Sequence, residues 1–148
     1  MLKKLIIMLI ALCITSVSYA EDWKNIKTNN IDRTIYLDLD SVRLLDVPDL
    51  TISNISKQKP LMFTVKVEFN NRSEMLTKYN VKTAIFKFNT LQNIDGRNYR
   101  LTETKYYNIN GSLIKTYGET NFTLLKKESM GYEADNMAMK QAISKGII

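Results

Sequence analysis

The hydrophobic and polar positions of the chain alternate in several short stretches, which is the pattern of β-strands with one buried face. Residues 61–69 show it most clearly, because Phe63, Val65 and Val67 alternate there with polar or charged side chains. Residues 34–42 repeat the pattern over their first six positions. We therefore predict two strands here, each with its apolar side chains directed into a core.

Residues 81–117 hold three further stretches rich in β-branched and aromatic residues, separated by two turn signals. These signals are Asp95-Gly96 and Asn110-Gly111, and both pairs tolerate the positive φ that tight hairpin turns require. The pattern predicts three antiparallel strands joined as a meander, which we place at the centre of the sheet.

Weaker signals surround these strands. A short strand is predicted at residues 22–26, and Asp40-Ser41 is expected to end the strand at 34–42 because both residues favour turns. Residues 50–55 are a candidate edge strand between Pro48 and Pro60. Residues 74–79 fit either a helical turn or the start of the next strand.

From residue 129 onward the apolar residues recur every three or four positions instead of every two. This spacing indicates an amphipathic helix. Ser129 is a suitable N-cap, and Lys145 followed by Gly146 is a suitable end. The apolar stripe consists of Met130, Ala134, Met137, Ala138 and Ala142. The simplest assembly is a single α+β domain, an antiparallel sheet of about six strands with this C-terminal α-helix packed on one face.

The second face of the predicted sheet is not uniformly polar. Ala84, Phe86 and Phe88 lie on one side of their strand, whereas Val81 and Ile85 lie on the other, and one helix cannot cover both sides. Two explanations remain open. Loops such as residues 43–60 fold over the far face, or a partner or a second copy of the chain covers it.

The first twenty residues have the features of a secretory signal. Lys3-Lys4 precede an apolar run at residues 5–14, and Ser18 and Ala20 are small residues at the cleavage positions. The run is about half of the ~20 residues that a membrane-spanning helix needs. We expect residues 1–20 to be cleaved, residues 21–148 to form one domain without a transmembrane segment, and the protein to be exported.

The composition excludes several kinds of chemistry. The sequence has no histidine, its five glycines are isolated, and its single cysteine, Cys13, lies in the signal. Histidine-dependent triads, phosphate loops and disulfides are therefore not expected. Asp38 and Asp40 lack the central glycine of a calcium loop, because Arg43 stands there. We expect no catalytic residues, metal, cofactor or enzymatic activity, although a hydrolase built on Asp, Glu, Lys or Tyr stays open.

The charge is mildly basic. It is +6 for the whole chain and +4 once Lys3 and Lys4 are removed, and no run of five like charges occurs. A nucleic-acid partner is therefore not expected. Basic and aromatic residues do gather in the meander, and the candidate binding residues are Arg97, Arg100, Lys105, Tyr106 and Lys115.

The strand period restricts how those residues are presented. Counted by twos, Arg100 and Tyr106 fall on one side of their strand and Lys105 on the other. Arg97 and Lys115 lie near the hairpin turns, so we expect them to be more exposed and the better candidates. Tyrosine also has a high strand propensity, so a purely structural role for the tyrosines of the meander stays open.

The chain resembles the surface-adhesin E-like family. The likeness covers about residues 22–144 and rests on short motifs, which are Trp23, Tyr36-Leu37-Asp38 with Ser41-Val42, Asn98-Tyr99-Arg100-Leu101 with Tyr106-Tyr107 and Gly111, Phe122 and Ser129. The resemblance implies a bent antiparallel sheet with a C-terminal helix, and an exported protein of the bacterial envelope that can dimerise. It also implies an adhesin that recognises host matrix or serum proteins such as vitronectin or laminin. The alternative is a periplasmic structural or inhibitor protein without an adhesive role.

Overall fold

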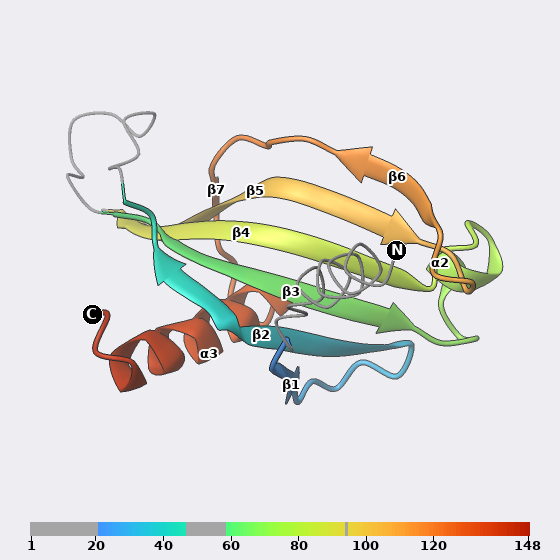
Figure 1. Ribbon diagram of the computed structural model, residues 1–148, viewed down its shortest axis with the longest axis horizontal. Coiled ribbons are helices and arrows are strands. Elements are labelled where there is room, and N and C mark those ends of the chain that lie inside the picture. Colours follow the sequence, from blue (N-terminus) through green and yellow to red (C-terminus); the bar gives the residue numbers. More distant parts are fainter. Residues whose placement is uncertain (1–20, 47–58, 94) are drawn as a thin grey trace, which may run out of the picture.

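The computed structural model describes residues 21–46, 59–93 and 95–148. In these ranges the chain forms seven strands and two helices (Figure 1). The strands are β1 (Trp23–Ile26), β2 (Arg33–Leu44), β3 (Leu61–Phe69), β4 (Thr83–Asn93), β5 (Gly96–Tyr107), β6 (Leu113–Tyr117) and β7 (Thr123–Leu124). The helices are α2 (Glu74–Thr77) and α3 (Met130–Ser144). The strand predicted at residues 50–55 lies outside the described residues.

All strands belong to one antiparallel sheet in the order β1-β2-β3-β4-β5-β6, so each strand pairs with its neighbour in sequence. The short β7 returns to pair with the beginning of β5, through Asn98 opposite Leu124 and Tyr99 opposite Thr123. Helix α3 packs on one face of the sheet, mainly against β2. The predicted α+β fold, with one antiparallel sheet and a C-terminal helix, is confirmed. The predicted meander forms β4, β5 and β6, but its central place in the sheet is wrong, because it makes up one side of the sheet and ends at the edge strand β6. Strand β7 was not predicted.

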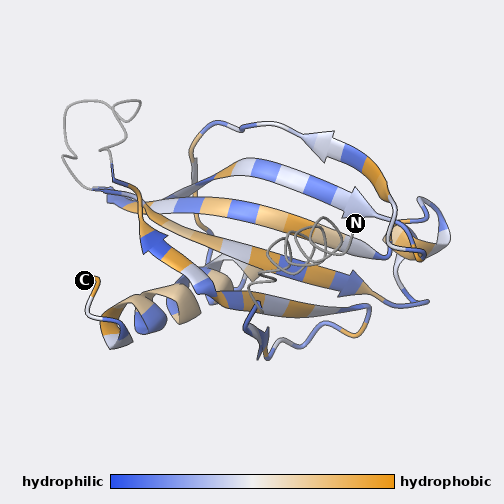
Figure 2. Cartoon of the chain, viewed as in Figure 1, coloured by the Kyte–Doolittle hydropathy of each residue, from blue (hydrophilic) through white to orange (hydrophobic). Residues whose placement is uncertain are grey.

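Alternation of side chains explains how the strands build the core. In β3 every odd residue from Leu61 to Phe69 is buried and every even residue is partly exposed, and Figure 2 shows the corresponding alternation of hydropathy along the central strands. Phe63 stands opposite Phe88 of β4, and their rings stack with centroids 5.2 Å apart. The core therefore lies between the odd side of β3 and helix α3.

Helix α3 begins and ends where the sequence predicts. The Ser129 hydroxyl accepts a hydrogen bond from the Tyr132 backbone N–H, Lys145 is the C-cap, and Gly146 has a φ of 66°. Ala134, Ala138 and Ala142 are fully buried in the core cluster. Small side chains along this line let the helix axis lie close to the sheet.

Two predictions for individual residues are wrong. Asp40-Ser41 do not end β2, which runs to Leu44; instead the pairing with β3 shifts between Asp38 and Arg43. Ser41 spans this irregularity, because its hydroxyl donates to the Asp38 carbonyl and accepts from the Thr64 N–H.

Val81 does not lie on the far face but is buried in the core cluster, where its N–H donates to the Met75 carbonyl of α2. Residues 74–77 are helical, which decides between the two predictions for that segment.

A β-bulge in β5 changes which residues share a face. Asn89 of β4 pairs with Arg100, Phe88 with Leu101, and Lys87 with Glu103, so Thr102 is an extra residue without a partner. The alternation of side chains therefore cannot be continued across Thr102 to decide which residues share a face. Arg100 and Lys105 lie on the same face, and Tyr106 lies on the opposite one, contrary to the prediction.

Candidate functional site

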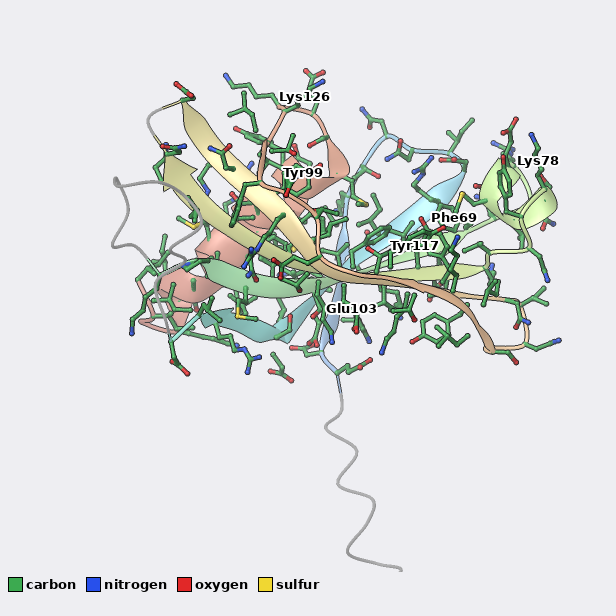
Figure 3. All side chains as sticks on the ribbon, turned by 90° about the horizontal axis from the view of Figure 1, so that it is seen from above. Phe69, Lys78, Tyr99, Glu103, Tyr117 and Lys126 are labelled. Carbon is green, nitrogen blue, oxygen red and sulfur yellow. The ribbon has the colours of Figure 1, made fainter. Side chains whose placement is uncertain are left out.

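The sheet has two unlike faces. The helix face carries α3 and the buried core. The outer face points away from α3, and in the described part of the chain no helix packs on it. Figure 3 shows the two sides of β5, with Tyr99 on the helix face and Glu103 on the outer face. The cross-strand register places on the outer face Trp23, Tyr36, Asp38, Thr64, Lys66, Thr83, Ile85, Lys87, Arg100, Glu103, Lys105 and Tyr107.

Two aromatic rings and one lysine contact one another on the outer face. Lys66 stands opposite Tyr36, and its Nζ lies 4.6 Å from the Trp23 ring centroid and 4.8 Å from the Tyr36 ring centroid. Cation–π attraction at these distances holds the three side chains together. The side chain of Lys66 is only 21% exposed and its Nζ also lies 3.4 Å from Glu68. Since the chain's own lysine fills this aromatic pair, the pair acts as a firm platform and not as an empty receptor for a foreign cation.

A second group of charges lies on the neighbouring strands. The Nζ of Lys87 is 2.8 Å from Oε1 of Glu103, and the Nζ of Lys105 is 3.5 Å from the same atom. The pKa of Glu103 is lowered, first by its hydrogen bond with Lys87 and also by the charge of Lys105. Two cations therefore share one carboxylate, and this part of the outer face carries an excess positive charge.

Acidic side chains lie on the β1 and β2 side of the outer face, opposite the lysines of β4 and β5. Burial raises the pKa of Asp38, and the neighbouring carboxylates Glu21 and Asp40 raise it further. Opposing this, the Asp40 backbone N–H donates to Asp38 Oδ1 at 3.1 Å. The indole N–H of Trp23 donates to Glu21 Oε2 at 2.7 Å, which orients the ring at this acidic end.

An open hollow of about 480 Å³ lies between these acidic and basic side chains, and of the aromatic platform only Trp23 lines it. Thr64, Thr83 and Ile85 come to it from the central strands β3 and β4, and Trp23 and Tyr107 come from β1 and β5. Glu21 and Asp38 give it an acidic end, whereas Lys87 and Lys105 give it a basic end. Aromatic side chains, one aliphatic residue and charges of both signs are the groups that a protein surface uses for recognition.

The predicted binding residues do not form one site. Arg97 lies on the helix face, where its guanidinium donates to Asp135 Oδ1 and Oδ2 of α3 at 2.6 and 2.9 Å and to the Thr90 hydroxyl at 2.7 Å. Its side chain is 21% exposed. The expectation that Arg97 is among the more exposed residues is therefore wrong, because an ion pair with α3 draws it inward.

Tyr106 and Lys115 stand opposite each other near the edge of the helix face. The Tyr106 ring lies 5.3 Å from the Tyr117 ring, and the Nζ of Lys115 lies 4.7 Å from the Tyr117 ring centroid. Burial raises the pKa of Tyr106. Lys115 is exposed, as expected. These residues form a small group of their own, separate from the hollow.

Arg100 and Lys105 share the outer face. The Nη1 of Arg100 donates to Glu119 Oε1 at 2.8 Å, and the guanidinium stacks over Phe122 at 4.8 Å. Lys105 is the one predicted binding residue that lines the hollow. Sequence reasoning missed Trp23, Tyr36 and Lys66 as a group, although alternation already placed Lys66 on the side away from the core. What it lacked was the register between β1, β2 and β3.

The described residues hold no group of three or more His, Cys, Asp or Glu side chains arranged to bind a metal ion. No helix in the same part of the chain is both long and apolar enough to cross a membrane. Comparisons with protein-family models, curated proteins and solved structures find no match to this chain. The family resemblance and everything it implies about function therefore stay predictions.

Proposed function

We propose that the chain is an exported bacterial envelope or surface protein that acts by binding another protein, without catalysis. The observation that carries this proposal is the hollow on the outer face. Trp23 of the aromatic platform and charges of both signs line it, and no helix among the described residues packs on this face. Trp and Tyr are enriched among the residues that dominate binding energy, and charges around them set approach rate and specificity.

The rigidity of the platform supports a binding role. Trp23 is fixed by Glu21 and Lys66, and Tyr36 is fixed by Lys66. Side chains that are already ordered lose less conformational freedom on association, so a larger part of the contact energy appears as affinity. The partner class that follows from the family resemblance is a host matrix or serum protein of the vitronectin or laminin type, with an envelope protein as the alternative.

The test is binding of the purified chain to an immobilised panel of matrix proteins, serum proteins and envelope extracts. The Trp23→Ala variant should weaken saturable binding by roughly thirtyfold, as expected for a central aromatic contact worth about 2 kcal/mol. Lys105→Glu should weaken it by about fivefold and reduce its salt dependence, because this charge lines the basic end of the hollow. Lys126→Glu, an exposed charge reversal outside the hollow, is the matched control.

Each variant must melt within a few degrees of the wild type for the comparison to count. Undiminished binding by both Trp23→Ala and Lys105→Glu would move the site away from the hollow and overturn the proposal. Binding to envelope proteins alone would assign the chain to the periplasmic structural or inhibitor class instead of the adhesins.

A further inference from the structure

The edge strand β1 and helix α3 line a groove on the helix side of the sheet, away from the outer face. The groove has a volume of about 300 Å³. Ile26 of β1 and Met137 of α3 are its apolar lining. Because a helix runs beside the open edge of a sheet, the groove has the geometry in which other proteins take up an extended peptide as an additional strand.

The backbone of β1 is arranged to accept such a strand. The Leu39 N–H donates to the Asp22 carbonyl at 3.0 Å, and β1 pairs with β2 in regular register up to Ile26 opposite Ile35. In an antiparallel pair, residues bonded to the neighbour alternate with residues whose N–H and C=O point the other way. Trp23 and Asn25 therefore direct their backbone groups outward, and among the described residues no strand lies beyond β1. Open backbone groups of this kind are a template for another chain.

The charge around the groove selects the chemistry of the occupant. Lys24, Lys27 and Lys140 line it, against the single carboxylate of Glu133. None of the three lysines is in ion-pair contact with a carboxylate of the described residues. Three unpaired cations beside one anion repel one another, and an acidic ligand relieves that repulsion.

We propose that the groove between β1 and α3 binds an acidic, extended segment of a partner protein, which adds as a strand along β1. Backbone hydrogen bonds to Trp23 and Asn25 would align the segment, and every second side chain would enter the groove over Ile26 and Met137. Glutamate or aspartate side chains at the rim would reach the lysines. This surface shares only Trp23 with the hollow, whose side chain faces the hollow while its backbone belongs to the edge, and the proposal does not depend on the proposed function.

The probe is a blocked octapeptide of alternating valine and glutamate, titrated into the purified chain by calorimetry. We expect saturable binding that Lys24→Glu and Lys140→Glu each weaken by about fivefold, the effect of losing one exposed charge pair of about 1 kcal/mol. The alternating valine and lysine peptide should not bind. Lys105→Glu, in the hollow, and Lys126→Glu, outside both surfaces, should leave binding of the acidic peptide unchanged.

A second measurement separates strand addition from simple charge attraction. Asn25→Pro removes an outward N–H that the pairing of β1 with β2 does not use, and proline is tolerated at such edge positions. It should weaken peptide binding at least about tenfold while the melting temperature is kept. A peptide with N-methyl groups on alternate residues tests the same hydrogen bonds from the ligand side and does not require the variant to fold.

Three results would overturn the proposal. One is the absence of binding, and another is binding that both the Asn25→Pro variant and the N-methylated peptide leave intact. The third is a dimer in sedimentation that Asn25→Pro separates, since a second copy of the chain would then occupy this edge.

Discussion

At the scale of single residues, the contact with most consequence for stability joins α3 to the sheet. Asp135 is 2% exposed, yet it accepts hydrogen bonds from Thr90 of β4 at 2.6 Å and from Arg97 of β5. A buried carboxylate is costly unless it is paired and fully hydrogen-bonded, and here both of its oxygens have donors. The same contact explains why Arg97, which the sequence suggested as a surface residue, is a structural one.

Asp135→Ala should lower the free energy of unfolding by about 3–5 kcal/mol, because it leaves the Arg97 guanidinium without its partner in a half-buried site. The double variant Arg97→Met with Asp135→Leu should lose less than Asp135→Ala alone, because neither charge is then left behind. Urea unfolding followed by circular dichroism measures both. Lys87→Ala serves as a control and should cost at most about 1 kcal/mol, since its side chain is 51% exposed and Glu103 keeps a second cation, Lys105.

Two carboxylates of the outer face, Asp38 and Glu103, should respond to pH in opposite directions. The raised pKa of Asp38 means that the folded chain holds this proton more tightly than the unfolded chain, so its stabilising contribution is present at low pH and is lost as the pH rises through the folded pKa. The lowered pKa of Glu103 gives a contribution that is present above its unfolded pKa and is lost as the pH falls through the folded pKa.

Asp38→Asn should therefore be more stable than the wild type at pH 7 and lose that advantage near pH 3. Glu103→Gln should be less stable at pH 7 and approach the wild type near pH 3. Urea unfolding of the three proteins at both pH values checks the signs. If the two variants shift stability in the same direction at pH 7, the opposite environments assigned to these carboxylates are wrong.

At the scale of elements, helix α3 is held by small side chains. Ala134, Ala138 and Ala142 are fully buried one turn apart, whereas Ile143 on the same helix is 61% exposed. The stripe predicted from the sequence is thus the packing surface, and its small residues set the distance between helix and sheet. A larger side chain there has no space to occupy without moving the helix.

Ala138→Leu should lower the free energy of unfolding by about 1–3 kcal/mol through overpacking. Ile143→Ala should change it by no more than about 0.5 kcal/mol, because the side chain it removes is mostly in solvent. Chemical unfolding of both variants gives the comparison. Equal stability of Ala138→Leu and the wild type would show that α3 can shift on the sheet, contrary to close packing.

How far the sequence predicts each element depends on the range of the interactions that form it. Alternation in β3 and the turns at Gly96 and Gly111, whose φ values are 124° and 79°, are local signals, so the meander was predictable. The extra residue Thr102 leaves no local mark, because bulges depend on the partner strand. Asp135 and Arg97 are 38 residues apart, and only the fold brings them together. For that reason the sequence could not show that the candidate binding residues lie on both faces of the sheet.

At the scale of the whole molecule, the sheet covers its helix face with α3 and presents the outer face and the β1 edge outward. The two proposed binding surfaces meet at β1, because the Trp23 side chain lines the hollow whereas the Trp23 backbone belongs to the open edge. The charges agree with this division. The hollow has acidic and basic ends, whereas the groove beside β1 is lined by three lysines and one carboxylate.

The proposed export makes a prediction for the chain as a whole. If residues 1–20 are a cleaved signal, the protein recovered from a bacterial envelope fraction starts at Glu21 and contains no cysteine, because Cys13 is the only one in the sequence. N-terminal sequencing should therefore begin Glu-Asp-Trp, and a reducing agent should leave the melting temperature unchanged because no disulfide can form. An envelope protein that still begins at Met1, or a cytosolic one, would contradict export through a cleaved signal. A cytosolic location would in addition remove envelope proteins from the candidate partners of both surfaces, whereas an uncleaved signal would not.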